Sequence, residues 1–515
     1  MNRTISIARR DLRKYPDALR LWLALARWGL PVWLVISASA ARAETDRPPN
    51  VVLILADDLG YRELGCFGQR LIKTPNLDRL ASEGLRLTQH YAGSAVCAPS
   101  RCVLMTGKHP GHAAIRNNQE VKPEGQAPLP REEQTLAEVL HAAGYATGAF
   151  GKWGLGAPAS VGDPRHQGFD RFFGYNCQRH AHSYYPDYLW SDFERVPLNN
   201  HPAIPGHARF DEGVDSSNPS NYAQFQGTEY APDRIHQEAL AFVRENADRP
   251  FLLYYPTVIP HLALHVPDES VEPYRQLGWP DPPFTKQEGG GYTPHFTPRA
   301  AYAGMISRLD DYVGRLLQLL EELELEENTI VIFTSDNGTT HLKREVDHEF
   351  FQSVGELRGL KGSLYEGGIR VPTIVRWPGN VAAGSSSEFV SGFEDWLPTL
   401  AEICQAPCPP SLDGLSLVPT LRGESQPARS FLYREFDGYG GQQMVRRGDL
   451  KAVRMQLKRG PAATELYDLS TDRGEQRDLA EIQPRQLAEL EAIMTREAAL
   501  ARDPRDVDTF PKSDK

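Results

Sequence analysis

Two short and almost wholly apolar segments constrain the fold more than any other feature of this 515-residue chain. Asn50–Ala56 reads NVVLILA, and residues 329–334 read TIVIFT. Such runs, without alternating polar residues, are typical of strands that are covered on both faces, as in a parallel sheet. The two segments therefore predict the centre of an α/β domain.

Helix-like and strand-like patterns alternate between these segments and around them. Helices are predicted at 75–83, 135–143 and 300–323, and further strands at 146–150, 251–255 and 371–376. This order is typical of a large, mainly parallel sheet flanked by helices. We expect this α/β domain to span residues 48–423.

Two long segments have no clear period. Residues 178–232 are rich in Pro, Asn, His and Tyr, and residues 278–298 have the same character. We expect both to be surface excursions near the substrate entrance.

The sequence changes character after about residue 423. Short strands with turn residues between them are predicted at 431–434, 443–445, 450–454 and 465–469, followed by a helix at 484–499. These patterns predict a smaller C-terminal α+β domain with an antiparallel sheet over residues 424–515.

The N-terminus has the features of a signal peptide over residues 1–43. Basic residues precede an apolar stretch at about 28–40, and Ala41-Arg42-Ala43 matches an A-x-A cleavage pattern. The stretch contains Gly29 and Pro31 and is shorter than the ~20 residues of a membrane span. We therefore expect export to the periplasm or the extracellular space, without a stable membrane span. The pattern leaves open whether the signal is of the Sec or the twin-arginine type.

The chain is acidic, with a formal net charge of −11. Cleavage after Ala43 would make it more negative, because residues 1–43 hold eight basic and two acidic residues. A protein of this charge has no reason to bind nucleic acid non-specifically. It also repels anions at long range, so any anion site must carry its own positive charge.

Six cysteines are few for an exported chain of this size. Cys404 and Cys408 lie close enough for one short disulfide near a Pro-rich turn. Three others, Cys66, Cys102 and Cys177, are expected to be buried or singly paired. Cys97 lies in a separate motif.

Oxygen-bearing side chains follow both apolar segments. Asp57-Asp58 ends the first and Asp336-Asn337 ends the second, and a glycine follows each pair closely. Ligands of open α/β sheets bind beyond the carboxyl ends of the strands, and carboxylate and amide oxygens suit Ca²⁺. Asp and Asn also end strands in ordinary turns, but two such pairs favour a metal site.

The most specific motif is VCAPSR at residues 96–101, followed by LMTGK at 104–108. It resembles the signature of the sulfatase family, Cys-x-Pro-Ser-Arg followed by a Leu-Thr-Gly-Arg-like run. The resemblance extends from residue 50 to the ELYDL segment at 465–469. It implies an alkaline-phosphatase-like fold and hydrolysis of sulfate monoesters. It also implies that a formylglycine-generating enzyme oxidises Cys97 to formylglycine (3-oxoalanine).

The resemblance further implies a role for each matching residue. The calcium ligands would be Asp57, Asp58, Asp336 and Asn337, together with the modified Cys97. Arg101 would orient the formylglycine, Lys152 would lie near it, Lys361 would bind the sulfate and His261 would contact the leaving oxygen.

Elementary chemistry supports these roles. Calcium and the two lysines would stabilise the charge that spreads over the sulfuryl oxygens in the transition state. His261 would act as the general acid, because the ordinary pKa of histidine suits that task. Asp336 would take the proton of the attacking hydroxyl.

The sequence departs from the family at one position. Many sulfatases read Gly-Lys-Trp-His-Leu-Gly where this chain reads GKWGLG at 151–156, so their histidine is replaced by Gly154. In those relatives the resemblance places this histidine by the formylglycine hydroxyl that eliminates sulfate. One hypothesis is that His182, in RHAHS at 179–183, supplies the missing base. The alternative is that His182 is a surface or core histidine beside Tyr184 and Tyr185, and the sequence leaves both open.

Two other functions compete with a sulfate-ester hydrolase. Relatives with the same nucleophile cleave phosphodiesters or phosphonate monoesters, and a non-catalytic sulfatase-like binding protein would tolerate Gly154. The intact Cys97, Arg101 and metal ligands disfavour the latter. The substrate class is also open, because the aromatic residues at 180–190, Phe436 and Tyr439 suit a sulfated carbohydrate and an aryl sulfate equally.

Overall fold

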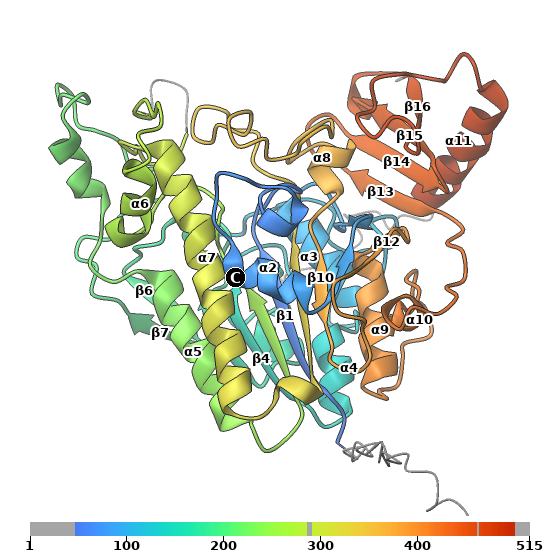
Figure 1. The fold of residues 1–515 in the computed structure, drawn as a ribbon, viewed down its shortest axis with the longest axis horizontal. Coiled ribbons are helices and arrows are strands. Elements are labelled where there is room, and N and C mark those ends of the chain that lie inside the picture. Colours follow the sequence, from blue (N-terminus) through green and yellow to red (C-terminus); the bar gives the residue numbers. More distant parts are fainter. Residues whose placement is uncertain (1–46, 286–290, 461–462, 500–515) are drawn as a thin grey trace, which may run out of the picture. The chain divides into compact units, whose positions relative to one another are not determined.

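A ten-stranded sheet forms the centre of the computed structural model, which describes residues 47–285, 291–460 and 463–499 (Figure 1). Its strand order is β11-β2-β10-β9-β1-β8-β4-β5-β6-β7. The strands are β1 (Asn50–Ala56), β2 (Leu85–Leu87), β4 (Ala146–Lys152), β5 (Arg171–Tyr175), β6 (Tyr188–Ser191), β7 (Glu194–Pro197), β8 (Phe251–Pro256), β9 (Thr329–Ser335), β10 (Ile374–Arg376) and β11 (Ser385–Ser387). The predicted signal peptide lies outside the described residues.

The two apolar segments are neighbours at the centre of this sheet. β1 pairs in parallel with β9 on one side and with β8 on the other, and every residue of β1 and β9 is buried. β4 pairs in parallel with β8 and β5, whereas β10 is antiparallel to both β9 and β2. The predicted mainly parallel sheet is confirmed, but the strand expected at 371–376 is shorter and runs in the opposite direction.

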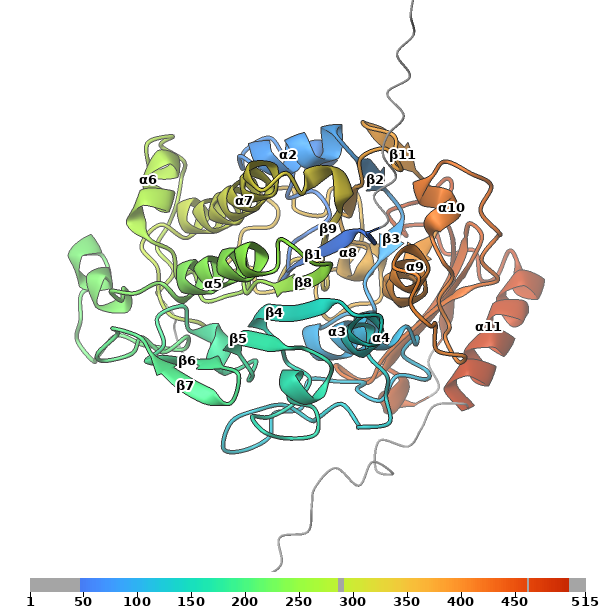
Figure 2. The same ribbon diagram turned by 90° about the horizontal axis from the view of Figure 1, so that it is seen from below.

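Helices cover both faces of the sheet (Figure 2). One face carries α2 (Pro75–Ser82), α5 (Ala231–Glu245) and α7 (Pro298–Glu322), and the other carries α3 (Cys97–Thr106), α4 (Leu136–Ala142) and α9 (Trp396–Ile403). Side chains of β1 alternate between two apolar cores, with Val52 and Ile54 in one and Val51 and Leu53 in the other. Within the described ranges, no helix is long and apolar enough to cross a membrane.

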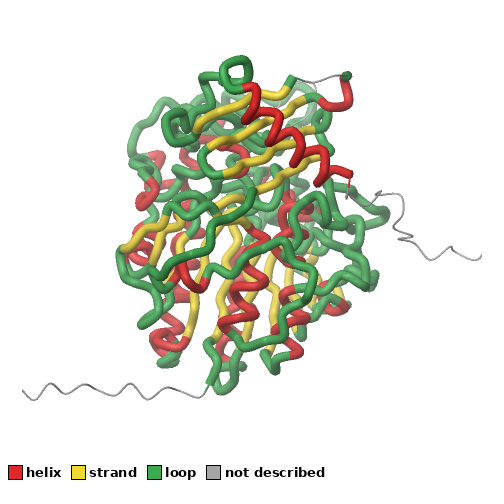
Figure 3. The backbone as a smooth tube through the Cα atoms, turned by 90° about the vertical axis from the view of Figure 1, so that its right-hand side faces the viewer, coloured by secondary structure: helices red, strands yellow, loops and turns green. Residues whose placement is uncertain are grey.

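The C-terminal part contains a separate four-stranded antiparallel sheet (Figure 3). Its strands are β13 (Leu432–Phe436), β14 (Gln442–Arg447), β15 (Leu450–Met455) and β16 (Thr464–Asp468). One face packs under α11 (Pro484–Ala499) through Leu490 and Met494. The other face packs against Leu364 and against Val96, the residue before Cys97. The predicted antiparallel sheet is confirmed, and it packs against the Cys97 motif through Val96.

The expected surface excursion at 178–232 is partly wrong. The segment contributes β6 and β7, and Tyr184, Tyr185 and Leu189 are almost inaccessible to solvent. Several of its aromatic side chains pack into the same core as α5, and their burial offsets the cost of ordering a segment without a regular period; they are Tyr184, Tyr185, Tyr222, Phe225 and Tyr230.

The predicted disulfide is also wrong. Cys404 and Cys408 are both free thiols. Cys404 is buried just after the last turn of α9, whereas Cys408 is exposed in the Pro-rich segment that follows. The two cysteines are close in sequence, but their side chains lie in different environments and do not form a disulfide.

A buried ion cluster connects the C-terminal sheet to a short helix of the α/β domain. The Nζ atom of Lys451 on β15 lies 2.8 Å from Glu366, the first residue of α8 (Glu366–Ile369), and 2.8 Å from Glu475. We predict that Lys451→Met lowers the free energy of unfolding by about 3–5 kcal/mol, because two buried carboxylates lose their shared cation.

Denaturant unfolding would measure this loss, with Lys458→Met as the control. Lys458 pairs with Asp437 at 2.7 Å, but both side chains are more than half exposed. The control should change stability by less than about 1 kcal/mol. Equal and small effects of the two substitutions would contradict the assigned role of the buried cluster.

Candidate active site

The register between β1 and β9 brings the predicted metal ligands together. Ala56 pairs with Ser335, so Asp57 and Asp336 leave neighbouring strands side by side. The backbone N–H of Asp58 donates to Asp336 Oδ1 at 3.2 Å. Asp58 has a φ of 67°, a left-handed conformation that is costly for a residue other than glycine. This strain indicates that the surrounding contacts fix the turn.

The donor set fits a hard cation. Asn337 Nδ2 donates to Asp58 Oδ1 at 2.7 Å, while Asn337 Oδ1 is buried and has no hydrogen-bond partner within the described part of the chain. Ligand atoms of Asp57, Asp58, Cys97 and His261 all lie within 4.8 Å of one another. An unpaired buried oxygen beside several carboxylates is what an oxygen-preferring ion such as Ca²⁺ would satisfy.

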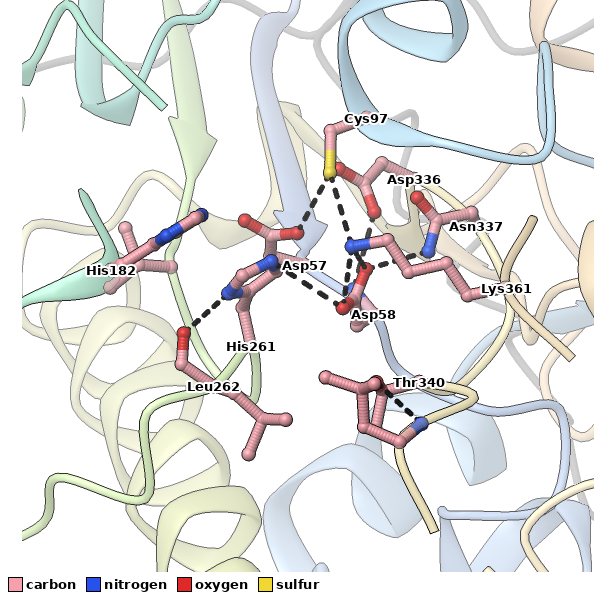
Figure 4. A network of polar contacts seen from close by, with 12 residues as sticks. Asp57, Asp58, Cys97, His182, His261, Leu262, Asp336, Asn337, Thr340 and Lys361 are labelled. Atoms are coloured by element: carbon pink, nitrogen blue, oxygen red, sulfur yellow. Dashed lines mark hydrogen bonds and ion pairs between the residues drawn. The ribbon is translucent and has the colours of Figure 1, made fainter. Parts of the chain in front are cut away.

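Cys97 is the first residue of α3 and lies over these carboxylates (Figure 4). Its Sγ atom is 3.4 Å from Asp57 Oδ1 and 3.6 Å from the Nζ atoms of both Lys152 and Lys361. Burial raises the pKa of the thiol to about 12. The encoded cysteine is therefore a weak nucleophile at neutral pH.

Three buried cations balance the three carboxylates of the site. Arg101 donates to Asp336 Oδ2 through Nε at 3.0 Å and through Nη2 at 2.8 Å. Lys152 Nζ lies 2.6 Å from Asp57 Oδ2, and Lys361 Nζ lies 2.7 Å from Asp58 Oδ1. The positive groups thus surround the position of Cys97.

This arrangement separates the pKa values of two neighbouring carboxylates. Burial alone would raise the pKa of Asp57, but the positive charges of Lys152 and its neighbours outweigh burial and hold that pKa well below its ordinary value. Burial, together with repulsion from Asp57, raises the pKa of Asp336 to about 6. Asp57 is therefore the more firmly ionised of the two.

The ring of His261 also lies close to these carboxylates. Its Nδ1–H donates to the backbone oxygen of Leu262 at 2.5 Å, which leaves Nε2 3.7 Å from Asp58 Oδ2. Burial, reinforced by Lys361, lowers the pKa of His261 to about 4. The expected ordinary pKa is therefore wrong for the substrate-free protein, because the sequence does not show how deeply the ring is buried.

His182 stacks on His261, with ring centroids 4.9 Å apart and planes 16° apart (Figure 4). His182 Nδ1 lies 2.9 Å from His207 Nε2, and His207 Nδ1 donates to the backbone oxygen of Gly291 at 3.0 Å. A neutral His207 must then accept at Nε2, so His182 donates from Nδ1 and keeps the lone pair on Nε2. Burial keeps the pKa of His182 well below its ordinary value. His182 is thus an oriented, neutral imidazole beside the site.

A cavity of about 180 Å³ opens onto these groups. Sequence reasoning had predicted five of the residues that line it as members of the site, namely Asp58, Cys97, His182, His261 and Lys361. Further lining residues that it missed are Asn118, Gln178, Tyr292 and His341.

The aromatic residues expected to contact substrate take two different positions. Tyr439, on the loop between β13 and β14, lines the cavity with its ring 5.8 Å from that of His341. Phe436 is buried behind it, with ring centroids 5.5 Å apart. Of the missed residues, Gln178 and Tyr292 had a signal in the sequence, because they lie within the segments 178–232 and 278–298 that were expected near the entrance.

Comparison with known proteins agrees with this geometry. The family model described as "Sulfatase" matches residues 49–406, and the model "N-sulphoglucosamine sulphohydrolase, C-terminal" matches residues 360–502. Human arylsulfatase A is 35% identical over 485 residues, which covers 88% of this chain and 87% of the relative. Mouse steryl-sulfatase is 31% identical over 548 residues, which covers 89% and 83%.

A solved structure shows the same fold. Ps i-CgsB, in complex with k-i-k-neocarrahexaose, superposes with a TM-score of 0.73 at 25% identity, covering 89% of this chain and 94% of that one. Together with the site, these matches show that the chain belongs to the sulfatase family of sulfuric ester hydrolases. The predicted family, its alkaline-phosphatase-like fold and its enzyme class are thereby confirmed.

Proposed function

We propose that the protein hydrolyses sulfate monoesters, with formylglycine made from Cys97 as the nucleophile and with a bound calcium ion. The observation that carries this proposal is the position of Cys97 Sγ, 3.6 Å from two lysine Nζ atoms and beside the buried carboxylates. The hydrated aldehyde would supply two hydroxyls on one carbon, one to attack sulfur and one to expel sulfate.

The chain's own residues would prepare the site for an anion. Asp57, Asp58, Asp336 and Asn337 would hold calcium, which would help to neutralise charge on the sulfuryl oxygens. Lys152 and Lys361 would supply the local positive charge that an acidic protein requires.

Two further groups would orient the site and contact the leaving group. Arg101, held between Asp336 and Asp57, would fix the position of residue 97. His261, with Nε2 directed toward Asp58, would contact the leaving oxygen of the ester.

His182 is proposed as the base that the family's missing histidine would otherwise supply. Its Nε2 lone pair is free for this role because His207 accepts from Nδ1. We predict that His182→Ala lowers kcat by about 10²- to 10⁴-fold, the usual contribution of a general base. His207→Phe should give a smaller fall, because it removes only the group that fixes the tautomer.

Steady-state kinetics would measure both effects, with His201→Ala as the control. His201 is exposed, and its substitution should leave kcat unchanged. The hypothesis fails if His182→Ala turns over as fast as the unsubstituted enzyme.

For the substrate we propose a sulfated carbohydrate ahead of an aryl sulfate. The relative Ps i-CgsB was solved with an oligosaccharide, and Tyr439 and His341 offer rings at the cavity against which a sugar could stack. The test is a desulfation screen of sulfated glycans and aryl sulfates, with matched phosphonate esters. The enzyme should be co-expressed with a formylglycine-generating enzyme, its proposed maturation partner. Efficient cleavage of the phosphorus esters alone would overturn the proposal.

We also propose that the protein is exported, to the periplasm or the extracellular space, by a signal peptide over residues 1–43. The support is the basic and apolar pattern that ends in Ala41-Arg42-Ala43. N-terminal sequencing of the protein from its native host would test it, and an intact Met1 would contradict it.

A further inference from the structure

The space next to Gly154 is filled by another side chain. A Cβ atom placed on Gly154 would lie 2.8 Å from Gln178 Nε2 and 3.1 Å from Gln178 Cγ. Gly154 also has a φ of +79°, which disfavours any other residue there. Gln178 therefore occupies the space that a histidine side chain at position 154 would have to enter.

The strand pairing carries Gln178 to the edge of the sheet where the site lies. Lys152, the last residue of β4, pairs with Tyr175, the last residue of β5. Gly154 and Gln178 follow these two residues closely, and Gln178 lines the same cavity as Cys97. The parallel pairing thus brings the side chain toward the groups that surround the nucleophile.

The amide nitrogen of Gln178 has no hydrogen-bond partner within the described part of the chain. The residue is only 5% exposed, and its Nε2 atom is buried without a hydrogen-bond partner among the residues that the structure describes. An unpaired buried amide is costly, and such groups call for a functional explanation. A ligand oxygen in the cavity would satisfy it.

We infer that the side-chain amide of Gln178 donates a hydrogen bond to a sulfuryl oxygen of the bound sulfate ester, in the space left by the residue missing at position 154. This inference rests on the proposed function. An amide donates and accepts hydrogen bonds but does not take up a proton at neutral pH. Gln178 therefore binds and orients the sulfate, and proton transfer falls to a separate group such as His182.

Gln178→Met tests the inference, because it keeps the length of the side chain and removes the donor. We expect kcat/KM for a sulfate ester to fall about 10- to 100-fold, as for a lost hydrogen bond to a charged group. Gln178→Glu has nearly the same shape and should lose at least as much, since its carboxylate repels the sulfate. The matched control is Gln167→Met, at a buried glutamine that does not line the cavity and whose Oε1 atom also has no partner among the described residues.

A second readout separates this inference from the proposed function. Binding of inorganic sulfate, measured by calorimetry, should weaken about 10- to 100-fold in Gln178→Met and stay unchanged in Gln167→Met. If the formylglycine-bearing enzyme turns over no sulfate ester, the proposed function fails while sulfate binding still tests Gln178. Unchanged sulfate affinity in both Gln178 variants, or kinetics equal to those of Gln167→Met, would overturn the inference.

Discussion

Cys97→Ala is expected to lower turnover of a sulfate ester by at least about 10⁴-fold, because it removes the atom from which the nucleophile is made. The matched control is Cys102→Ala, at another buried thiol of α3 whose side chain packs in an apolar core. That substitution should cost about 1 kcal/mol of stability through the cavity it leaves, without loss of turnover. Steady-state kinetics and denaturant unfolding of both variants would show the contrast.

Cys97→Ser separates attack on sulfur from release of sulfate. The Oγ atom of the introduced serine can form a bond to sulfur while the leaving oxygen takes its proton, but the product has no second hydroxyl on the same carbon to expel sulfate. We expect one turnover per protein molecule, which leaves a covalent sulfuryl group on the introduced serine. Mass spectrometry of the peptide that contains this position would detect the added group. Continuous turnover by Cys97→Ser would show that a hydrated aldehyde is not required.

The parts of the fold that the sequence predicted are those set by local pattern. The apolar runs of β1 and β9 needed no long-range information, because such a composition is typical of strands covered on both faces. The direction of β10 was not predictable, since its three residues carry no signal for their partner strand. The partial burial of residues 178–232 depends on aromatic side chains that pack into a core to which helices distant in sequence contribute, and the local pattern does not show this.

At the candidate site, too, residues in local motifs were predictable and residues that depend on distant contacts were not. Asp57, Asp336 and Cys97 could be predicted as site residues because each lies in a short motif at the end of a strand or the start of a helix. Gln178 was missed because its significance depends on contact with Gly154, which lies distant in sequence and close in space. The low pKa of His261 was missed for a related reason, since burial and Lys361 cause it.

Calcium is expected to stabilise the folded protein. At a free concentration about 100 times its Kd, a ligand that binds only the folded state adds about 2.7 kcal/mol to the free energy of unfolding. Asn337→Leu should abolish most of this gain, because it keeps the size of the side chain and removes Oδ1, the buried oxygen for which the described residues offer no partner. Thermal unfolding with calcium and with a chelator would measure the shift in both proteins. An equal calcium shift in the variant would contradict the assignment of Asn337.

The charges of the site also predict that calcium and sulfate assist each other's binding. Asp57, Asp58 and Asp336 are already balanced by the cations Arg101, Lys152 and Lys361. Calcium alone would therefore add uncompensated positive charge to a buried site, and sulfate alone would add negative charge. Because such coupling is reciprocal, each ion should raise the affinity for the other by the same factor. Stabilisation by both ions together should exceed the sum of the separate effects, and a strictly additive result would show that the two ions do not share this site.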